Sequence, residues 1–581
     1  MRSTLGDQEQ TQPRLENLRR GFPAGALLLA ALVFAAYLPA ILDAGFVWDD
    51  DEYLTANPLI VAPDGLRKIW FSFESPSQYF PLVYTSFRVE HALWGFDPRG
   101  YHLTNVVLHL LNALLLWWLL ARLEVGGAWF AAALFALHPV QVESVAWITE
   151  RKNVLSTLFF LASLAAWLEF VREERARPWR WYALSLALFP PALFAKTSTV
   201  TLPAVMALLL WLRGQPIGRG RVVQLLPFAA CAVPFALLTI WWERYHQGTR
   251  GPVFDFSIPE RLLIAGRALW FYPQKLVWPV DLAFSYPRWE IDSARPAGYL
   301  WPLATCAAAG LLWSRRDHWP RGVAAGLLFY LITIAPMLGF VALYTFRYTF
   351  VADHYQYLAS AGIFCVATAL YRQRVAALPE GVLQMALGRA VPAAILLALT
   401  AMTWRQTHAY RDEETLWRDT IRKNPTSSLA RVNLGNLLVD SGKAEEGMAE
   451  FRDVLAHDPG DAQARYNLAW ALAETGRIAE AEAEYRETIR RHPESSSARV
   501  NLAVLLAQSG RVGERVALYR EALRIEPSDA GLWHDLGMAL LSAGAPDEAV
   551  PAFNRALTLD PGRAMTRAAL KMALAGATRS R

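Results

Sequence analysis

The chain has 581 residues, of which 54% are hydrophobic and 19% charged, and its mean hydropathy is +0.19. These values exclude a disordered chain, a coiled coil and a small disulfide-bonded scaffold. The charge is unevenly distributed. Residues 412–581 carry 22 Lys+Arg and 25 Asp+Glu, which leaves 35 and 27 for residues 1–411, so the net charges are −3 and +8. An apolar, basic region therefore precedes a polar, slightly acidic one.

Residues 22–411 contain apolar stretches as long as a membrane helix, which needs about 20 residues to cross a hydrocarbon layer. The first stretch follows a basic tail, 1–21, and its length favours a span over a cleaved signal peptide. The stretch 261–280 carries three cationic residues and two prolines, so we interpret it as an interfacial or re-entrant helix. We predict an all-α polytopic bundle of about eleven spans, at residues 22–42, 101–121, 126–146, 154–171, 180–197, 199–212, 222–242, 298–314, 322–342, 354–371 and 389–404.

Lys and Arg in short loops predict the orientation of the bundle, because such loops stay in the cytoplasm. An odd number of spans then places the loop 43–100 and the region 412–581 together on the outer side. These basic loops also account for the pI near 9.0, so we predict no nucleic-acid partner. High Ala, Leu and Arg usage suggests a bacterial inner membrane with a periplasmic outer side. The loops assigned to the cytoplasm are 1–21, 172–180, 213–221, 315–321 and 372–389.

Residues 412–581 repeat with a period of 34. Prolines recur at 425, 459, 493, 527 and 561, and glycines at 442, 476, 510 and 544. This is the period of the tetratricopeptide helix–turn–helix unit. We predict a leading half-repeat at 412–427, four repeats over 428–563, and a capping helix and tail at 564–581.

Such solenoids bind proteins or peptides on a concave surface. Asn433, Asn467 and Asn501 share one repeat position, where a side-chain amide can bond the backbone of an extended acceptor peptide. This arrangement resembles the asparagine ladder in the superhelix of O-GlcNAc transferase. The alternative interpretation is that asparagine is simply common at this helix position.

The loop after the first span begins with four acids, Asp49 to Glu52. Clustered carboxylates raise one another's pKa, and a carboxylate near an acceptor hydroxyl can act as a general base. The alternative is a solvated acidic loop. His102 and His109 lie seven residues apart on one helix face, but a pair of histidines without a placed acid does not make a metal site, and the cysteines have no metal-ligand spacing, so we predict no metal.

Motifs that follow in order suggest a family. Asp49-Asp50 precedes Gln78-Tyr79-Phe80-Pro81-Leu82 and Ser86-Phe87-Arg88, and then come His102-x-x-Asn105-x-x-x-His109 and His138-Pro139-x-x-x-Glu143. In this order the chain resembles the transmembrane and tetratricopeptide-repeat-containing O-mannosyltransferases, within the protein O-mannosyltransferase superfamily. The motifs cover residues 20 to about 160, and the order of membrane region and repeats matches over the whole chain.

The resemblance implies a glycosyltransferase-C fold and a sugar donor linked to a polyprenyl phosphate, used on the outer side. It implies that the catalytic base lies in Asp49–Asp50, with Asp49 as our choice and Asp50 in support. Cations on the outer side would stabilise the phosphate leaving group, although each could also be an ordinary interfacial charge. The candidates are Arg88, Arg151, Lys152, Lys196 and Arg347.

Two departures from the family pattern put mannose as the donor sugar in doubt. Glu150-Arg151-Lys152-Asn153 stands where the family has Gly-Arg-Ala-Asp, and Asp353-His354-Tyr355-Gln356-Tyr357-Leu358 stands for a Glu-Arg-x-x-Tyr-Leu element. The family works without a sequence-fixed metal, though divalent ions aid some members. Further polar residues that we assign to the site are His102, Asn105, His138, Glu143 and His354.

We therefore predict an inverting membrane glycosyltransferase that transfers a sugar to Ser/Thr hydroxyls of an exported protein, with the repeats holding the acceptor. One alternative is a non-catalytic scaffold, in which the spans only anchor the repeats. Another is a polyprenyl-linked glycan ligase or polymerase that acts on envelope polysaccharide, for which the same lipid-phosphate residues would serve.

Overall fold

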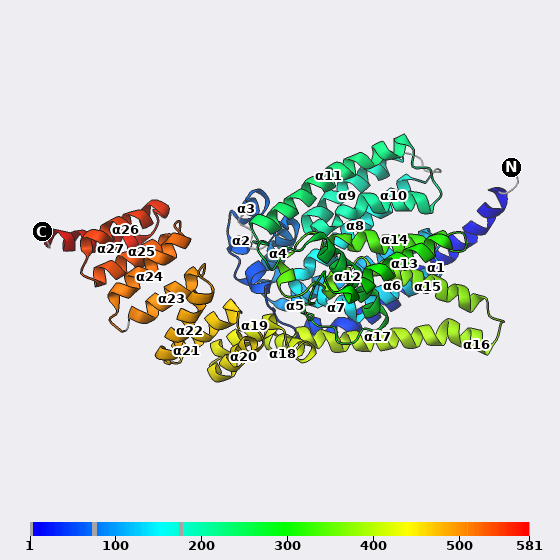
Figure 1. Cartoon of the computed structure of the whole chain (residues 1–581). Helices are drawn as coiled ribbons and strands as arrows, with labels where there is room; N and C mark the ends of the chain where they lie inside the picture. Colours follow the sequence, from blue (N-terminus) through cyan, green and yellow to red (C-terminus); the bar gives the residue numbers. More distant parts are fainter. Residues whose placement is uncertain (1–3, 73–77, 173–177, 508, 580–581) are drawn as a thin grey trace. The chain divides into compact units, whose positions relative to one another are not determined.

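The computed structural model describes residues 4–72, 78–172, 178–507 and 509–579, with side chains from residue 22 onward. The chain divides into two compact units, Met1–Asn424 and Pro425–Arg581. Both units consist of helices and turns, and the described residues contain no strand, in line with the predicted all-α class (Figure 1).

Eighteen α-helices are described in the first unit. They begin at residues of the expected kind: α5, for example, starts at Pro98, and the Asp97 side chain accepts the N–H of Arg99 at 3.1 Å. The helices are α1 (Thr4–Asp43), α2 (Pro58–Val61), α3 (Gly65–Phe71), α4 (Pro81–Trp94), α5 (Pro98–Arg122), α6 (Ala128–Leu137), α7 (Val142–Ala146), α8 (Arg151–Phe170), α9 (Trp179–Ala195), α10 (Leu202–Leu212), α11 (Arg219–Tyr245), α12 (Ile258–Val277), α13 (Leu300–Ser314), α14 (Arg321–Ile334), α15 (Ser360–Ala376), α16 (Val382–Met385), α17 (Val391–Thr407) and α18 (Glu413–Lys423).

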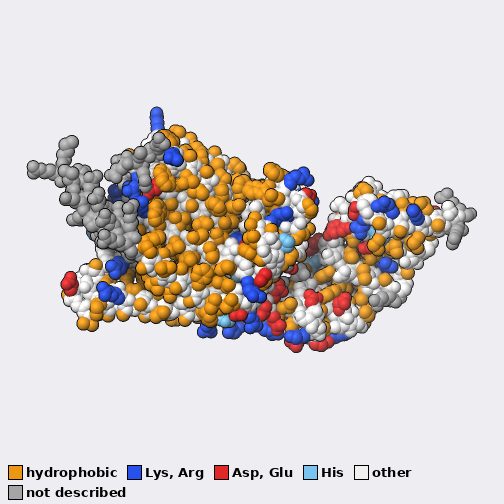
Figure 2. All heavy atoms as spheres, turned by 180° about the vertical axis from the view of Figure 1, so that it is seen from behind, with side chains coloured by type: hydrophobic (Ala, Val, Ile, Leu, Met, Phe, Trp, Pro, Cys, Tyr) orange, Lys and Arg blue, Asp and Glu red, His pale blue; other side chains and the backbone are white. Residues whose placement is uncertain are grey.

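Five stretches of helix among the described residues are long and apolar enough to cross a membrane. Shorter apolar helices accompany them in the first unit, and the count of about eleven spans stays a prediction. Figure 2 shows hydrophobic side chains covering a broad face of this unit, as expected of a surface in contact with lipid. The five stretches are Phe22–Asp43, Pro98–Arg122, Ile148–Phe170, Arg219–Tyr245 and Val382–Tyr410.

The predicted span 126–146 is wrong as one continuous helix. α6 ends at Leu137 because Pro139 holds the preceding residue, His138, in an extended conformation. The chain then passes through three short turns of helix, η2 (Pro139–Gln141), α7 and η3 (Ile148–Glu150), before α8 begins. We refer to residues 138–150 as the polar segment. All of its residues are buried. Protein therefore surrounds its backbone N–H and C=O groups, which lipid could not hydrogen-bond.

The second unit is a stack of helix pairs with the period that the sequence predicts. Four glycines at the predicted turns, Gly442, Gly476, Gly510 and Gly544, have φ between 69° and 79°, a region that favours glycine. One large aromatic residue of each pair is buried in the core, as at Phe451. The pairs are α19 (Ser428–Asp440) with α20 (Ala444–His457), α21 (Ala462–Glu474) with α22 (Ile478–Arg491), α23 (Ser496–Ala507) with α24 (Val512–Ile525), and α25 (Ala530–Ser542) with α26 (Pro546–Leu559), followed by α27 (Ala564–Arg579).

Helix α18 is the one part of the predicted repeat region that belongs to the first unit. Its Trp417 is buried against Phe284, with 5.4 Å between ring centroids, and against Trp48, with 6.2 Å. The sequence predicts a leading half-repeat at 412–427, and the aromatic residue of that stretch packs on the loops of the first unit.

Candidate active site

The candidate site begins after α1, at the aspartates Asp49 and Asp50. Trp48 turns the chain with a φ of 50°, which a bulky residue rarely adopts. The centroid of its ring lies 5.5 Å from that of Trp147, at the end of α7. The turn brings both carboxylates to Thr149 in the polar segment.

Thr149 binds the two aspartates in different ways. Its backbone N–H donates to Oδ1 of Asp50 at 2.9 Å, and the N–H of Val47 donates to Oδ2 at the same distance, so both oxygens of this buried carboxylate are held. The Thr149 hydroxyl donates to Oδ1 of Asp49 at 2.8 Å. Oδ2 of Asp49 accepts no hydrogen bond from the described residues, which leaves it open to an acceptor hydroxyl.

Burial raises the pKa of both carboxyls. It raises the pKa of Asp49 to about 6, although Lys152 and the Thr149 hydroxyl lower it in part. Burial, and next the charge of Asp49, raise the pKa of Asp50 to about 8, against the two backbone N–H donors. Asp49 is therefore the stronger acid of the pair and is largely ionised at neutral pH, as a general base must be.

Two lysines approach one glutamate at the start of α8. Nζ of Lys152 lies 2.9 Å from Oε1 of Glu150, and Nζ of Lys196 lies 3.5 Å from Oε2. Lys196 also donates to Oδ1 of Asn153 at 2.7 Å. Because two ammonium groups share one carboxylate, this group of three carries a net positive charge.

His354 joins the same cluster from η8 (Asp353–Gln356). Its Nδ1 lies 3.1 Å from Oε1 of Glu143, and its Nε2 lies 3.9 Å from Oε1 of Glu150. Its backbone N–H donates to Oε2 of Glu143 at 2.8 Å. The structure thus brings together four predicted residues that lie far apart in the chain: Glu143, Lys152, Lys196 and His354.

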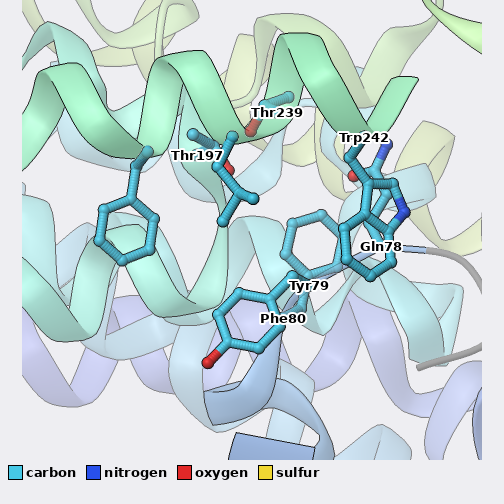
Figure 3. A pocket seen from close by; sticks show the side chains of 8 residues that line it. Gln78, Tyr79, Phe80, Thr197, Thr239 and Trp242 are labelled. Atoms are coloured by element: carbon cyan, nitrogen blue, oxygen red, sulfur yellow. The ribbon is translucent and has the colours of Figure 1, made fainter. Parts of the chain in front are cut away.

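Two cavities flank the junction of Lys196 and Thr197. One, of about 20 Å³, is lined by Asn153, Lys196 and His354 together with hydroxyl residues and tyrosines. The other, of about 10 Å³, is lined by Thr197 and, as Figure 3 shows, by aromatic rings and polar side chains from the loop before α4 and from α11. Its labelled residues are Gln78, Tyr79, Phe80, Thr197, Thr239 and Trp242.

Arg151 does not face these cavities, which corrects its predicted phosphate-binding role. Its side chain is fully buried, and Nη2 donates to Glu90 Oε1 at 3.1 Å and to the Tyr101 carbonyl at 2.9 Å. Nη1 also pairs with Glu90, and Nε bonds Asn105. Every nitrogen of the guanidinium is engaged inside the protein, so none is left for a ligand.

Three other predicted residues hold the backbone around the site. Asn105 donates to the carbonyl of Val145 at 3.2 Å, while His102 and His138 bond the carbonyls of Gly45 and Leu276 at 3.1 and 3.0 Å. These contacts position the loop and the polar segment, and they correct the prediction that the three side chains belong to the site itself. Among the described residues no group of three or more His, Cys, Asp or Glu could hold a metal ion.

The two remaining cations also lie apart from the cluster. Nη1 of Arg88 donates to the carbonyls of Ile60 and Ala62 at 2.9 and 3.0 Å and so caps α2. Arg347 is exposed, and its guanidinium lies 5.9 Å from the centroid of the Tyr348 ring. Of the five predicted phosphate ligands, the structure brings Lys152 and Lys196 together.

The three asparagines of the repeats donate within the repeats. Nδ2 of Asn433 donates to its own helix at the carbonyl of Leu429, at 2.8 Å, and Nδ2 of Asn467 donates to Oδ1 of Asn436, also at 2.8 Å. Nδ2 of Asn501 donates to the hydroxyl of Tyr466 at 2.7 Å. Each bond uses a donor of an amide group for which we predict contact with an acceptor peptide, and two of the bonds link neighbouring repeats.

Three residues of the site were not predicted, namely Thr149, Glu150 and Asn153. The last two lie in the stretch that departs from the family pattern, so their carboxylate and amide could have been noticed beside Lys152. A single threonine in an apolar stretch gives no signal of its own.

Two tetratricopeptide-repeat family models match the second unit, one over residues 438–500 and the other over 474–530 and 515–564. Among solved structures, a crystal structure of MamA covers 26% of this chain and 86% of its own chain, at 20% identity and a TM-score of 0.24.

Curated relatives carry one kind of name. The human protein O-mannosyl-transferase TMTC2 is 29% identical over 46% of this chain and 35% of its own length. The protein O-mannosyl-transferases F38B6.6 of Caenorhabditis elegans and TMTC4 of Homo sapiens are 24% and 26% identical, each over 72% of this chain and over 61% and 64% of their own lengths. The chain thus spans between about a third and two thirds of these relatives. It is a tetratricopeptide-repeat-containing protein homologous to the protein O-mannosyl-transferases.

Proposed function

We propose that this chain is a membrane glycosyltransferase that moves a sugar from a polyprenyl-phosphate donor to a Ser or Thr hydroxyl of a protein. One observation carries the proposal: a carboxylate with an open oxygen, Asp49, lies close to Lys152 in a site that also holds Lys196. A base and a group of cations are what transfer from a phosphate leaving group requires.

In the proposed step, Oδ2 of Asp49 takes the proton of the acceptor hydroxyl while the hydroxyl oxygen bonds to the anomeric carbon. The bond between that carbon and the phosphate oxygen breaks, and its electron pair leaves with the polyprenyl phosphate. Attack opposite the leaving group inverts the anomeric carbon. Asp50, whose two oxygens are held by backbone N–H groups, positions Asp49 and does not touch the substrate.

The lysines balance the charge that grows on the leaving phosphate. Glu150 is shared by the two lysines, while Asp49 also faces Lys152 and Glu143 also faces Lys196. Arg151 and Arg88 have no part in this step, because their N–H groups donate to backbone carbonyls of the protein, such as those of Tyr101 and Ile60.

The surroundings of the reaction are also proposed. The five long apolar helices and the shorter ones together form a bundle of about eleven spans in a bacterial inner membrane. Loop 43–100 and the repeats then face the periplasm, where the repeats hold the acceptor protein. The relatives are named O-mannosyl-transferases, so mannose is the first sugar to test.

The test uses the full chain in liposomes with polyprenyl-phosphate mannose and an extract of exported proteins. Asp49→Asn is expected to lower the transfer rate by about 10²–10⁴-fold, as loss of a general base does. Asp51→Asn is the matched control, because Asp51 is exposed two residues away, and it is expected to keep the wild-type rate.

A wild-type rate for Asp49→Asn would rule out the mechanism. Failure of the wild-type chain to transfer a sugar from any polyprenyl-phosphate hexose would instead favour a scaffold. Sugar found on envelope polysaccharide rather than on protein would favour the ligase or polymerase.

A further inference from the structure

The first unit also has a large groove, whose lining shares no residue with the two cavities beside Lys196. It measures about 820 Å³ and lies between the end of α17, helix α18 and the loop 279–282. Ordinary small-molecule pockets measure roughly 300–1,000 Å³, so the groove has the size of a ligand site and can take a lipid headgroup. Its lining combines apolar residues, including Pro139, Val280 and Met402, with the charged residues Asp281, Arg405, Arg418, Asp419, Arg422 and Lys423.

The floor of the groove is fixed by hydrogen bonds. Nζ of Lys423 donates to the Leu282 carbonyl at 2.7 Å and to Asp419 Oδ2 at 2.6 Å, and Nε2 of Gln406 donates to the same carbonyl at 3.1 Å. These bonds join α17, α18 and the 279–282 loop. The groove is thus a preformed feature rather than a gap between independent segments.

The rim of the groove is basic. Arg405, Arg418 and Arg422 are exposed. Arg418 pairs with Glu414 at 2.8 Å and Arg422 pairs with Asp419, whereas the guanidinium of Arg405 forms no hydrogen bond or ion pair with the described residues. With Lys423, four cations face three carboxylates, Asp281 and Asp419 in the lining and Glu414 beside it, so one positive charge remains and the groove favours an anion.

The groove lies at the end of a stretch that can cross a membrane, Val382–Tyr410. Apolar side chains beside it are open to the surroundings: Val277 is 79% exposed, Trp278 is 70% exposed and Trp404 is 40% exposed. Tryptophan gathers where a membrane meets water, and basic groups there attract anionic lipid headgroups. The rim therefore stands at the level of the headgroups.

We propose that this groove binds the phosphodiester headgroup of an anionic glycerophospholipid, with the arginines on the phosphate and the first part of the acyl chains against Met402 and Val280. This lipid is a resident of the protein, separate from the sugar donor. The inference rests on the groove alone and does not depend on the proposed transfer reaction.

Native mass spectrometry of the full chain in detergent tests this proposal, with phosphatidylglycerol and phosphatidylcholine as probes. The wild type is expected to retain phosphatidylglycerol in preference to phosphatidylcholine. The variant R405Q/R418Q/R422Q is expected to bind phosphatidylglycerol about tenfold more weakly, since each cation contributes to headgroup attraction. The control R490Q/R520Q/R524Q removes the same charge from the exposed surface of the repeats and is expected to keep wild-type binding.

The single variant Arg405→Glu is a second test that does not depend on the folding of the triple variant. Arg405 forms no hydrogen bond or ion pair with the described residues, so its replacement is expected to leave the fold intact. It is expected to weaken phosphatidylglycerol binding while circular dichroism stays that of the wild type. Unchanged binding in both groove variants, or equal loss in the control, would overturn the proposal. Inorganic phosphate that displaces phosphatidylglycerol at equal concentration would show a soluble-phosphate site and would also overturn it.

Discussion

At the residue scale, the electrostatics of Asp49 control the pH range of the proposed reaction. Asp49 must be ionised to accept a proton, and burial raises its pKa to about 6. We therefore expect kcat/KM for sugar transfer to fall as pH drops through about 6 and to level off above it. The measurement is a pH profile of transfer in liposomes.

Replacement of Lys152 should move this profile in a defined direction. Lys152 lowers the pKa of Asp49, so in Lys152→Gln that pKa rises and the acid limb of the profile moves to higher pH. Arg405→Gln, which changes a groove cation that is not among the main causes of the shift in the pKa of Asp49, is the control and should leave the limb in place. A limb that stays at its wild-type pH in Lys152→Gln would show that this lysine does not act on the base.

Arg151 illustrates what a sequence cannot reveal at this scale. Its position in a family motif predicts a phosphate ligand. In the structure, however, its guanidinium forms a buried salt bridge with Glu90 of α4. We expect Arg151→Met to lower the free energy of unfolding by about 3–5 kcal/mol, because it leaves Glu90 buried and uncompensated. Thermal unfolding in detergent measures this loss.

The control for that prediction is Arg490→Met, which breaks the exposed Arg490–Glu487 pair of the repeats and should leave unfolding close to wild type. If Arg151→Met instead unfolds like the wild type and loses only sugar transfer, the phosphate role would be restored.

At the element scale, the repeats show how much a period can predict. Proline and glycine every 34 residues fixed the turns, because both residues restrict where a helix can start or end. The polar segment shows the opposite case. Most of it lies in the stretch 126–146, whose overall composition predicts a membrane span, and the contacts of His138, Asn105 and Asp50 with other elements reveal a buried chain of short turns.

A glycine inside a repeat helix supplies an element-scale prediction. Gly435 of α19 lies against the Phe451 ring, and an added Cβ would overlap that ring. We expect Gly435→Ala to lower the free energy of unfolding of the repeats by about 1–3 kcal/mol, as overpacking does. Thermal unfolding of the full chain, followed by circular dichroism, measures the change.

Gly513 provides the matched control, since it lies in α24 with open space around it. Gly513→Ala should be neutral or gain up to about 1 kcal/mol, because alanine favours helix more than glycine does. Equal effects of the two substitutions would show that the contact of α19 with Phe451 is not tight.

At the scale of the whole molecule, the number of spans decides where each region can work. An odd count places loop 43–100 and the repeats on one side, and the turn 315–321 on the other. We expect a membrane-impermeant maleimide to label Asp64→Cys and Ser441→Cys in whole spheroplasts, and Arg316→Cys only after lysis. The background for these variants replaces Cys231, Cys306 and Cys365.

Labelling of Ser441→Cys only after lysis would give an even span count and separate the repeats from the proposed active side. The sequence alone could not resolve this count, because several predicted spans became helices of 10–17 residues that length and composition do not identify as crossing a membrane.

The hydroxyl and the N–H of Thr149 hold both aspartates, and the same short stretch of chain carries Lys152 three residues later. The proposed proton acceptor and the proposed cation for the departing phosphate are thus held by one short stretch of backbone. If the proposed mechanism holds, a change that shifts this backbone disturbs both together, so rate losses from substitutions at Asp49, Thr149 and Lys152 should not add. A double-mutant cycle of transfer rates would then show the three as one kinetic unit.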